Sequence, residues 1–368
     1  MRLRQLALCV CSAVVALAQP VATQPGGGAD WVGAAAALPT EGFARPSGAF
    51  VPVLPRDHAP HPEAATESWQ LSVHLHGSEG AAMGLQMSLL RLGLVPPDAA
   101  VDALPDSGWA ARGIYRGHVT ILAGDAAAGE ERFGRAMAGV AGLDAADGVL
   151  RLDDWTLDFG APEDAAGWRL AARAGDLRAT LALVPQRSPA AIGAEALPLR
   201  GYAVTRLAVT GRIETPQGPQ TVTGTAWFEH LWGELPLPGG GPVASDRLLL
   251  QLDDGGELSM IRTRRVDGRG APTLEAVLIA PDGSASALQG AEVDVVPQTA
   301  WAGRLGDWPL VWQLRAGDLE LAVTPVVEDQ EHGFAAPAWI GVVRAEGRRG
   351  DRAVRGLGTL QLTGYGTP

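Results

Sequence analysis

Apolar and polar residues alternate along most of the chain after residue 50. In residues 69–76 the odd positions are Trp, Leu, Val and Leu, whereas the even positions are Gln, Ser, His and His. Residues 77–80 read Gly-Ser-Glu-Gly, and residues 83–89 then alternate again. Because successive side chains of a strand point to opposite faces of a sheet, these residues predict a β-hairpin with one apolar face.

A second hairpin is predicted in the C-terminal half of the chain. Residues 247–252 and 257–264 alternate in the same way and flank the turn sequence Asp-Asp-Gly-Gly at 253–256. Further turn sequences of the Asp-Gly type lie at 147–148, 267–268 and 282–283. Helical periodicity is confined to residues 130–140, where two glycines weaken it. The chain is therefore predicted to be all-β and antiparallel.

A short repeat points to two similar domains. The sequence Arg-Ala-Gly-Asp-Leu occurs at residues 173–177 and again at 315–319, and 315 minus 173 gives a spacing of 142 residues. This spacing matches the length of one domain, so we predict two β domains at residues 51–200 and 201–368. Closed barrels are favoured over open sheets because closure leaves no strand edge exposed. Residues 19–50 are rich in Gly, Ala and Pro and are predicted to be a flexible linker.

The first residues have the pattern of a secretory signal. Arg2 and Arg4 precede an apolar stretch at residues 6–17, and the sequence Ala-Leu-Ala ends it with small residues at the cleavage position. We predict a signal peptide at residues 1–18 and an exported protein, periplasmic or extracellular after cleavage near Ala18. Both cysteines lie within this segment. The rest of the chain has no uninterrupted apolar run of the roughly 20 residues that a membrane-spanning helix needs, so an integral membrane protein is not expected.

Charge and composition narrow the range of partners. The chain has 29 basic residues, all arginine, against 41 acidic ones, which gives a formal charge of −12 spread without acidic blocks. A nucleic acid partner is therefore not expected. The group Arg262, Arg264 and Arg265 is too sparse to bind an anionic membrane surface and is interpreted as a solvated strand face. Hydrophobic residues make up 46% of the chain, which excludes general disorder.

Two histidines share one face of the first predicted hairpin. His74 and His76 are two residues apart, and His58 and His61 lie upstream with Asp57 beside them. Imidazole pairs of this kind ligate zinc and similar ions, so a metal-dependent activity is one hypothesis. We favour a simpler interpretation, in which His74 and His76 are polar residues on the outward face of a half-buried strand, and we expect no metal or other cofactor.

Several candidate catalytic and ligand-binding residues lie in residues 224–233, which read Gly-Thr-Ala-Trp-Phe-Glu-His-Leu-Trp-Gly. On a regular strand, Glu229 lies on the same face as Trp227, and His230 lies on the same face as Trp232. A carboxyl group placed between apolar side chains inside a barrel has a raised pKa and is a candidate proton donor, and indole faces can stabilise a carbocation. The competing interpretation is a tryptophan-rich core strand in which Glu229 bonds to an arginine, and the chemistry of the segment alone favours that one.

A series of short sequences runs in order along most of the predicted mature chain. They are Leu-Pro-Arg-Asp-His at 54–58, His-Pro at 61–62, Glu-Ser-Trp at 67–69, Gly-Leu-Gln at 84–86, Arg91, Leu-Asp-Asp-Trp at 152–155, Val-Thr-Gly-Thr-Ala-Trp at 222–227, Glu-His at 229–230, Trp232, Leu-Gln-Leu-Asp-Asp-Gly at 250–255, Asp-Gln-Glu at 329–331 and Leu-Thr-Gly-Tyr at 362–365. In this order and spacing the chain resembles the lipocalin-like family of carotenoid hydratases and AttH-type secreted proteins, often described as secreted hydrolases.

The resemblance implies two lipocalin-like β-barrels packed together, in agreement with the repeat. Carotenoid hydratases add water to an isolated terminal double bond of an acyclic isoprenoid without a cofactor, which needs an acid in a dry pocket and a placed water. By this resemblance Glu229 and His230 are the candidate catalytic residues, and Trp227 and Trp232 line the ligand. Other matching positions that are expected to contribute to the ligand site are Trp69, Glu67, Gln86 and Glu331.

Four positions depart from the family pattern. Glu229 stands where the family has aspartate, Leu231 replaces a second acid, Ser68 replaces one of two paired tryptophans, and residues 245–247 read Ser-Asp-Arg where Trp-Asp-Trp is expected. Two hypotheses follow. In the first, the protein binds an apolar isoprenoid- or lipid-like molecule and hydrates or hydrolyses it. In the second, it is a non-catalytic cell-envelope factor that carries cargo for, or scaffolds, an ABC-type export system, because AttH-type proteins are commonly associated with such permeases.

Overall fold

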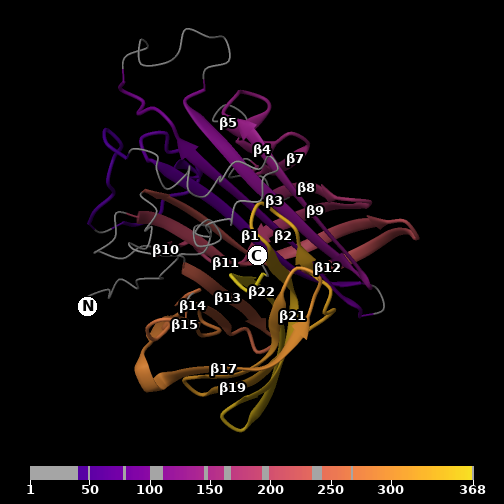
Figure 1. Ribbon diagram of the computed structural model, residues 1–368. Helices are drawn as coiled ribbons and strands as arrows, with labels where there is room; N and C mark the ends of the chain where they lie inside the picture. Colours follow the sequence, from indigo (N-terminus) through magenta and orange to yellow (C-terminus); the bar gives the residue numbers. More distant parts are fainter. Residues whose placement is uncertain are drawn as a thin grey trace.

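Two antiparallel β-sheets make up nearly all of the described chain (Figure 1). The computed structural model describes residues 40–366 except for 49, 78–79, 100–110, 145–147, 161–166, 193–198, 234–242 and 267. The signal peptide predicted for residues 1–18 therefore lies outside the described residues. Within the part of the chain that is described, no helix is long and apolar enough to span a membrane.

Twelve strands form the first sheet: β1 (Thr66–Gly77), β2 (Ala82–Gly93), β3 (Gly113–Ala123), β4 (Ala126–Arg135), β5 (Ala141–Asp144), β6 (Val149–Leu152), β7 (Trp155–Asp158), β8 (Trp168–Ala174), β9 (Leu177–Pro185), β10 (Ala190–Ile192), β11 (Leu199–Thr215) and β12 (Gly218–Gly233). Ten strands form the second sheet: β13 (Val243–Leu252), β14 (Glu257–Arg265), β15 (Thr273–Ile279), β16 (Ala285–Leu288), β17 (Val293–Ala302), β18 (Asp307–Ala316), β19 (Leu319–Pro325), β20 (Glu331–His332), β21 (Ala338–Arg349) and β22 (Arg352–Thr363). Two short 3-10 turns, η2 (Arg56–His58) and η4 (Gly290–Glu292), lie outside the sheets.

The two sheets repeat the same strand order. In the first sheet it is β4-β3-β2-β1-β12-β11-β9-β8-β7, followed by β6 and β5, and in the second it is β16-β15-β14-β13-β22-β21-β19-β18-β17. The short strands β10 and β20 pair outside these paths with β11 and β21. The repeated sequence Arg-Ala-Gly-Asp-Leu spans the turn between β8 and β9 and the turn between β18 and β19. Each strand of the second sheet thus has a counterpart in the first, which supports the duplication inferred from the sequence.

The boundary between the halves lies later than residue 200. β11 and β12 belong to the first sheet, where β12 pairs with both β1 and β11, and the second sheet begins with β13. The expected domains 51–200 and 201–368 are corrected accordingly, because β11 and β12 complete the first sheet by pairing with β9 and β1. Residues 40–50 are not simply a linker either, since Phe43 is buried and Ala44 forms a bridge with Ala64.

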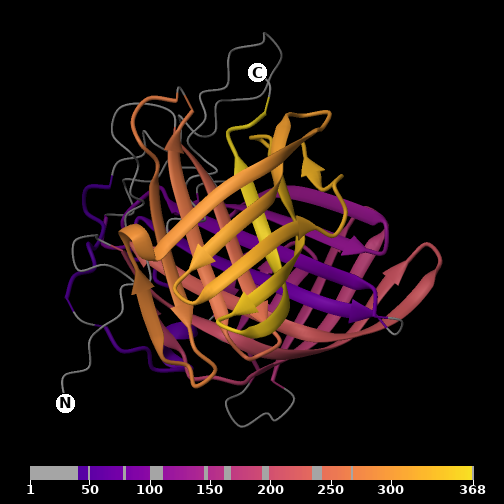
Figure 2. The same cartoon turned by 90° about the horizontal axis from the view of Figure 1, so that it is seen from below.

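Three apolar clusters hold the fold together. The first sheet curls into a nearly closed barrel whose interior includes Leu71, Trp155 and Phe228, and the second curls into a half-barrel around a cluster that includes Trp308 and Trp339 (Figure 2). The third cluster contains residues of both sheets and lies between them. The predicted all-β fold of two packed lipocalin-like β-barrels is confirmed, with the second sheet forming a half-barrel in place of the closed barrel that was favoured. Residues 130–140 form the end of β4 and a turn instead of a helix.

Both faces of β1 and of the C-terminal half of β12 are buried, which changes the interpretation of the polar alternation. One face of each strand lines the barrel, and the other lies against the second sheet. His74 is buried there, with Nδ1 at 2.9 Å from Gln251 Oε1 and Nε2 at 3.0 Å from Thr359 Oγ1. The expected outward orientation of His74 is wrong, because a second sheet lies where solvent was expected. His76, farther along β1, is exposed.

Candidate functional site

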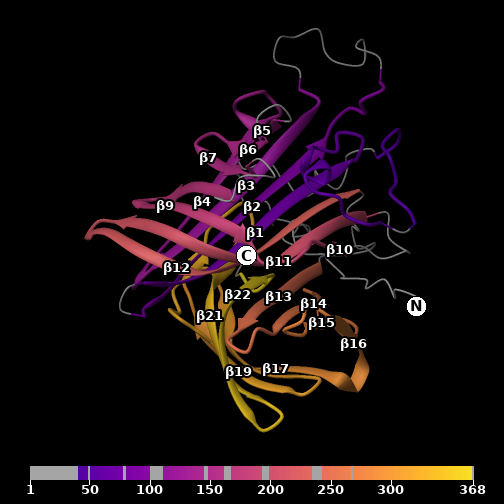
Figure 3. The same ribbon diagram turned by 180° about the vertical axis from the view of Figure 1, so that it is seen from behind.

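The start of β1 and the end of β12 meet at one mouth of the first barrel, and the chain that precedes β1 lies over it. Figure 3 shows this indigo segment looping beside that end of the sheet. Arg91 of β2 anchors the segment, because its Nη2 donates to the carbonyl oxygens of His61 and Ala64, both at 2.8 Å. Upstream, the N–H of Val53 donates to Asp57 Oδ2 at 2.7 Å and closes the turn that contains η2. Hydrogen bonds thus fix the shape of the segment that completes the site.

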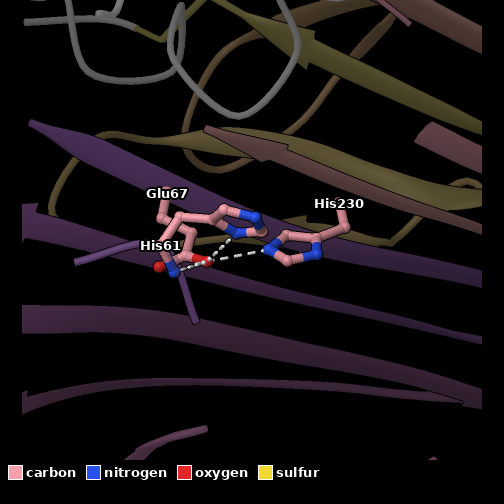
Figure 4. A group of neighbouring side chains, drawn as sticks. All are labelled: His61, Glu67 and His230. Carbon is pink, nitrogen blue, oxygen red and sulfur yellow. Dashed lines mark hydrogen bonds and ion pairs between the residues drawn. The ribbon is translucent and has the colours of Figure 1, made fainter. Parts of the chain in front are cut away.

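Glu67 is the centre of the site (Figure 4). Its Oε1 atom lies 3.1 Å from Nδ1 of His61, 2.9 Å from Nε2 of His230 and 2.9 Å from the backbone nitrogen of His61. Its Oε2 atom accepts a hydrogen bond from Nε of Arg91 at 3.0 Å. The side chains of Glu67 and His230 are fully buried, so one carboxylate is surrounded by donors in a dry environment.

Burial and hydrogen bonding act on these groups in opposite directions. Burial by itself would raise the pKa of Glu67, but the hydrogen bonds from His230 and His61 and the charge of Arg91 hold that pKa well below its usual range. Burial lowers the pKa of His230, while its hydrogen bond to Glu67 opposes the shift. Glu67 is consequently a fixed anion that orients imidazole rings and is not itself a proton donor.

His61 is the member of the cluster that reaches toward solvent. Its side chain is 15% exposed, against 0% for Glu67 and His230. Its ring stacks on Trp232, with the centroids 3.6 Å apart and the planes inclined by 6°. Since Nδ1 faces the carboxylate, Nε2 is the nitrogen left for another molecule, and no hydrogen bond joins it to the described residues. A carboxylate that orients one imidazole nitrogen and leaves the other to react is an arrangement used for general acid–base chemistry.

Aromatic rings enclose His230 on the barrel side. Trp69 stacks over it with the centroids 4.9 Å apart, and Tyr202 meets it edge-on at 5.6 Å. Nδ1 of His230 lies 3.2 Å from the carbonyl oxygen of Asp57, so both of its ring nitrogens face acceptors. The indole N–H of Trp69 is buried and has no hydrogen-bond partner among the described residues. His230 is therefore held in place by its neighbours, while Trp69 offers a donor inside the barrel.

A further histidine extends the site inward. Nδ1 of His58 lies 2.5 Å from the hydroxyl oxygen of Tyr202, and the His58 ring stacks on Phe159 with the centroids 4.2 Å apart. Burial lowers the pKa of His58 to about 3 and raises the pKa of Tyr202 well above its ordinary value. The Tyr202 hydroxyl therefore donates to a neutral imidazole, and this hydrogen bond fixes the wall of the site.

Four of the expected site residues come together around this point: Glu67, Trp69, His230 and Trp232. They project from the faces of β1 and β12 at the barrel mouth, where His230 contacts the other three side chains. His230 and Trp232 share a face of β12, as the alternation predicts. The central position of Glu67 did not follow from the alternation, because it depends on the segment that folds over the barrel.

Glu229 lies on the opposite face of β12 and points toward the second sheet. Its Oε1 and Oε2 atoms accept hydrogen bonds from Nη2 of Arg247 at 2.6 and 2.7 Å, and Nε1 of Trp227 donates to Oε1 at 2.8 Å. Both oxygens of this carboxylate are engaged by a guanidinium, so Glu229 is an ion-pair partner that joins the two sheets. The expectation that Glu229 is a catalytic proton donor and Trp227 a ligand contact is corrected, and the arginine-bonded interpretation of this strand describes the structure.

Gln86 and Glu331 lie elsewhere in the molecule. Gln86 is buried on β2 between the two sheets, next to a void beside His332 that has room for about one water molecule. Glu331 belongs to the second sheet, where it accepts hydrogen bonds from Nε1 of Trp308 at 3.0 Å and from the backbone N–H of Leu305 at 2.8 Å. Neither residue contacts the Glu67 cluster among the described residues, so the ligand-site role expected of both is not supported by their positions.

The residues that complete the site are His61, His58, Arg91 and Tyr202, and sequence analysis did not place them there. His58 and His61 entered as possible metal ligands and as matching positions of the family, and Arg91 as a matching position, without a role in this site. Their grouping just before the strand that carries Glu67 is the signal that could have identified the histidines. No local pattern identifies Tyr202, because it reaches the site from β11, on the far side of the β12 strand.

Among the described residues, His61, Glu67 and His230 could also hold a metal ion, since their ligand atoms lie within 4.8 Å of one another. A cation there would have to replace both imidazole–carboxylate hydrogen bonds, and Arg91 already brings a positive charge to Glu67. His74, the earlier metal candidate, uses both ring nitrogens in hydrogen bonds to the second sheet. The geometry favours a proton-transfer site over a metal centre.

Comparisons with known proteins agree with this fold. A protein-family model described as AttH-like matches residues 46–365. Among solved structures, an AttH protein from Nitrosomonas europaea is similar with a TM-score of 0.71 and 23% sequence identity, over 88% of this chain and 100% of that chain. Kievitone hydratase from Nectria haematococca is similar with a TM-score of 0.61 and 12% identity, over 89% of this chain and 98% of that chain. Both likenesses concern the fold, and no curated protein matches the chain.

Proposed function

This chain belongs to the AttH-like family, and from that premise we propose that it is a cofactor-independent hydratase that binds an apolar, isoprenoid- or lipid-like molecule at the mouth of the first barrel. Kievitone hydratase, which shares the fold, supports the reaction class. The Glu67 cluster supports it too, because it combines a fixed anion, imidazoles and tryptophan faces. An exported location, periplasmic or extracellular, is part of the proposal and rests on the signal-like sequence of residues 1–18.

The observation that carries the proposal is the geometry of His61. Glu67 holds its Nδ1 atom, Trp232 stacks on its ring, the side chain is 15% exposed, and Nε2 has no hydrogen-bond partner among the described residues. Imidazole side chains are the usual groups for proton exchange near neutral pH. Glu67 and His230 are positioning residues in this scheme, and His61 is the group that exchanges the proton with the substrate.

In the proposed reaction, the charged form of His61 transfers its Nε2 proton to the less substituted carbon of a C=C double bond. The π electron pair forms the new C–H bond, and the positive charge on the other carbon faces the indole rings of Trp232 and Trp69, which attract cations. A water molecule then forms the C–O bond and returns one proton to Nε2, so the imidazolium is restored.

The substitution His61→Gln tests the assignment. We expect turnover to fall by about 10²–10⁴-fold, the usual contribution of a general acid–base group. Affinity for the same molecule should change little, because the glutamine amide still donates toward Glu67. The assay incubates the protein with squalene in oxygen-18 water and detects the labelled alcohol by mass spectrometry. Equal turnover by His61→Gln and the parent would exclude His61 as the proton donor.

Glu67→Gln and Glu229→Gln form a matched pair of controls, because the same acid-to-amide change is made on the two faces of the sheet. Glu67→Gln should lower turnover by at least about 10²-fold, since the anion that orients His61 is lost. Glu229→Gln should leave the turnover of folded protein close to that of the parent. The reverse result would place the chemistry between the sheets and contradict the proposal.

One observation favours a second candidate, a non-catalytic envelope factor that carries apolar cargo for, or scaffolds, an ABC-type export system. The barrel interior beside Trp69 and Phe228 is filled, and the void between them is too small for a water molecule. A filled barrel suits a scaffold better than an enzyme with a deep ligand cavity. Under this candidate, the parent protein hydrates neither squalene nor other isoprenoids and co-purifies with a permease from the cell envelope.

A further inference from the structure

A cleft of about 610 Å³ lies between the two sheets, at the other end of β1 from Glu67. Its walls are formed mainly by β1, β11 and β12 of the first sheet and by β13, β21 and β22 of the second. This volume is in the range of pockets that bind small organic molecules. His74, at the edge of the cleft, lies seven residues after Glu67. In an extended strand that separation is about 23 Å, so the cleft and the Glu67 cluster are distinct sites.

The cleft forms where strands extend beyond the region in which the two sheets touch. On these strands, the face that packs against the other sheet also lines the cleft. Along β22, Thr359 contacts His74 within the interface, and the next residues of the same row, Leu357 and Arg355, line the cleft. Side chains of a strand alternate with a period of two, so the same face that packs the sheets together lines the open space beyond. On β21, Arg344 likewise lies on the strand face that packs against the first sheet, and it lines the cleft.

The polar side chains at the floor of the cleft are satisfied within the protein. Nε2 of Gln251 donates to the carbonyl oxygens of Thr205 and Ala226, at 2.7 and 3.1 Å. This orientation leaves Gln251 Oε1 as the acceptor for Nδ1 of His74 and Oγ1 of Thr225, at 2.9 and 2.7 Å. The floor therefore presents hydrogen-bonding groups that are already paired within the protein, together with the apolar side chain of Leu357, and an apolar chain can lie against them.

The charges stand at the rim. Three arginines line the cleft, Arg206, Arg344 and Arg355, against two carboxylates, Asp253 and Glu346. Nε of Arg355 lies 3.8 Å from Oε1 of Glu346, whereas no ion pair of Arg344 is found among the described residues. Arg206 is paired with the buried carboxylate of Glu257 at 2.7 Å, so Arg344 is the arginine of the rim that is left to attract an anion.

We propose that this cleft binds an amphipathic anion, a molecule with an apolar chain and one carboxylate or phosphate head group. The chain lies along the floor between the sheets, and the head group pairs with Arg344 at the rim. A ligand in this position contacts both sheets and stabilises their packing by binding only the assembled form. The proposal does not rest on the function proposed for the Glu67 cluster.

Isothermal titration of the purified protein with dodecanoate, below its micelle concentration, tests the proposal. Dodecyl phosphate forms a second arm, and dodecyltrimethylammonium, with the same chain and the opposite charge, is the control. We expect saturable binding of one dodecanoate or dodecyl phosphate per chain, and the tighter of the two identifies the head group. Binding of the cationic molecule as tightly as the anions would overturn the proposal.

Variants of the rim and the floor locate the binding. Arg344→Gln should weaken dodecanoate about 3- to 5-fold, and Glu346→Gln should tighten it about 2-fold, as expected for partly exposed charges. Arg348→Gln, on the same strand but paired with Glu320, should have no effect. Thr223→Trp fills the cleft from β12 without changing its charge and should weaken binding by at least about 10-fold. Parent affinity in Thr223→Trp would overturn the proposal.

One further pair of results separates this site from the hydratase site. His61→Gln should leave the affinity for dodecanoate unchanged, and Thr223→Trp should leave turnover unchanged. Urea unfolding midpoints close to that of the parent establish that both variants are folded. Failure of the hydratase assay alone therefore leaves the cleft proposal standing, and loss of dodecanoate binding in His61→Gln would contradict it.

Discussion

Glu67 and Glu229 are two buried carboxylates on neighbouring strands, and they face opposite sides of the same sheet. Each has about 1% of its surface exposed and each is paired with an arginine, Glu67 with Arg91 and Glu229 with Arg247. Their remaining partners differ. Glu67 binds two imidazoles, whereas the further hydrogen bond to Glu229 comes from an indole N–H.

The difference in partners distinguishes a carboxylate with a structural role, Glu229, from one that can take part in acid–base chemistry, Glu67. Guanidinium and indole groups keep their protons at all ordinary pH values, so the partners of Glu229 join the two sheets and exchange nothing. Imidazoles gain and lose protons near neutral pH, so a carboxylate that orients them controls groups able to do acid–base work. The value of a buried acid as a candidate catalytic group therefore depends on what it binds more than on how deeply it lies.

The second half of the molecule contains an acid–arginine pair that corresponds to Glu67 and Arg91. The pairing of Glu67 with Arg91 across β1 and β2 recurs as the pairing of Asp246 with Arg262 across β13 and β14. In the second half, Asp246 also accepts a hydrogen bond from the hydroxyl of Tyr365 at 3.0 Å. Burial raises the pKa of Asp246, the opposite of the direction found for Glu67. The two halves thus share the acid–arginine pair, and the histidines distinguish the first.

The largest effect on stability is expected from Arg247→Leu, which leaves Glu229 buried without its charged partner. Removing one side of a buried ion pair costs about 3–5 kcal/mol in the free energy of unfolding. Urea denaturation followed by tryptophan fluorescence measures the loss. Adding Glu229→Leu to the same protein removes both charges and should restore most of the stability.

An exposed ion pair provides the control for this prediction. Arg348 pairs with Glu320 on the surface of the second sheet, and both side chains are more than half exposed. Arg348→Leu should therefore cost no more than about 1 kcal/mol. If Arg247→Leu cost no more than Arg348→Leu, the pair between the sheets would not have the structural role assigned to it.

An intermediate effect is expected from acid on the histidine side of the comparison. Burial lowers the pKa of His58 to about 3, from 6.5 for an unperturbed histidine. The unfolded chain therefore takes up the proton first, so the stability linked to neutral His58 is complete above about pH 6.5 and is lost as the pH falls toward 3. Between about pH 7.5 and 4.5 the loss amounts to about 2–3 kcal/mol.

His58→Gln removes this titration. The free energy of unfolding of the variant should fall less steeply than that of the parent over the same pH range. His230 and Asp57 are the charged groups nearest to His58, and both remain in the variant. Trp227→Phe alters the interface without changing a titrating group and should keep the slope of the parent. Parallel pH profiles of His58→Gln and the parent would contradict the prediction.

A smaller effect than that of acid is expected from Trp227→Phe, which removes one N–H donor from Glu229. The loss of a hydrogen bond to a charged group should lower the free energy of unfolding by about 1–2 kcal/mol and leave turnover unchanged. Trp232→Leu, on the other face of β12, removes the ring that stacks on His61 and should instead lower turnover about 10-fold by loosening its position. Reduced turnover in the first variant and not in the second would reverse the assignment of the two faces.

The alternation of residues predicted much of the local structure correctly. Both expected hairpins are present, as β1–β2 and β13–β14, and the repeated sequence forms the same turn in each half. The roles given to His74 and Glu229 were wrong for one shared reason. Alternation shows which side chains lie on the same face of a strand, but it does not show whether solvent, a barrel interior or a second sheet covers that face.

The site was harder to predict because its members are distant in the sequence. His61 reaches Glu67 through a local turn, but His230 and Tyr202 lie on β12 and β11, which follow the other strands of the first sheet along the chain. Motifs therefore identified Glu67, His230 and Trp232 as positions of interest without revealing that they meet. The boundary near residue 200 was misplaced for the same reason, since the closing strands lie beyond it.

By itself the sequence determined the all-β class, the hairpins, the duplication and which side chains share a strand face, because these follow from a period of two and from local turns. Only the tertiary structure decided which face of β12 lines the barrel and which joins the sheets. It made Glu67 the acid that orients imidazoles and Glu229 the acid that binds an arginine, and it opened the cleft between the sheets. The physical reason is that the partners of a buried polar group are set by sheet closure and packing, which bring together residues that no local pattern connects.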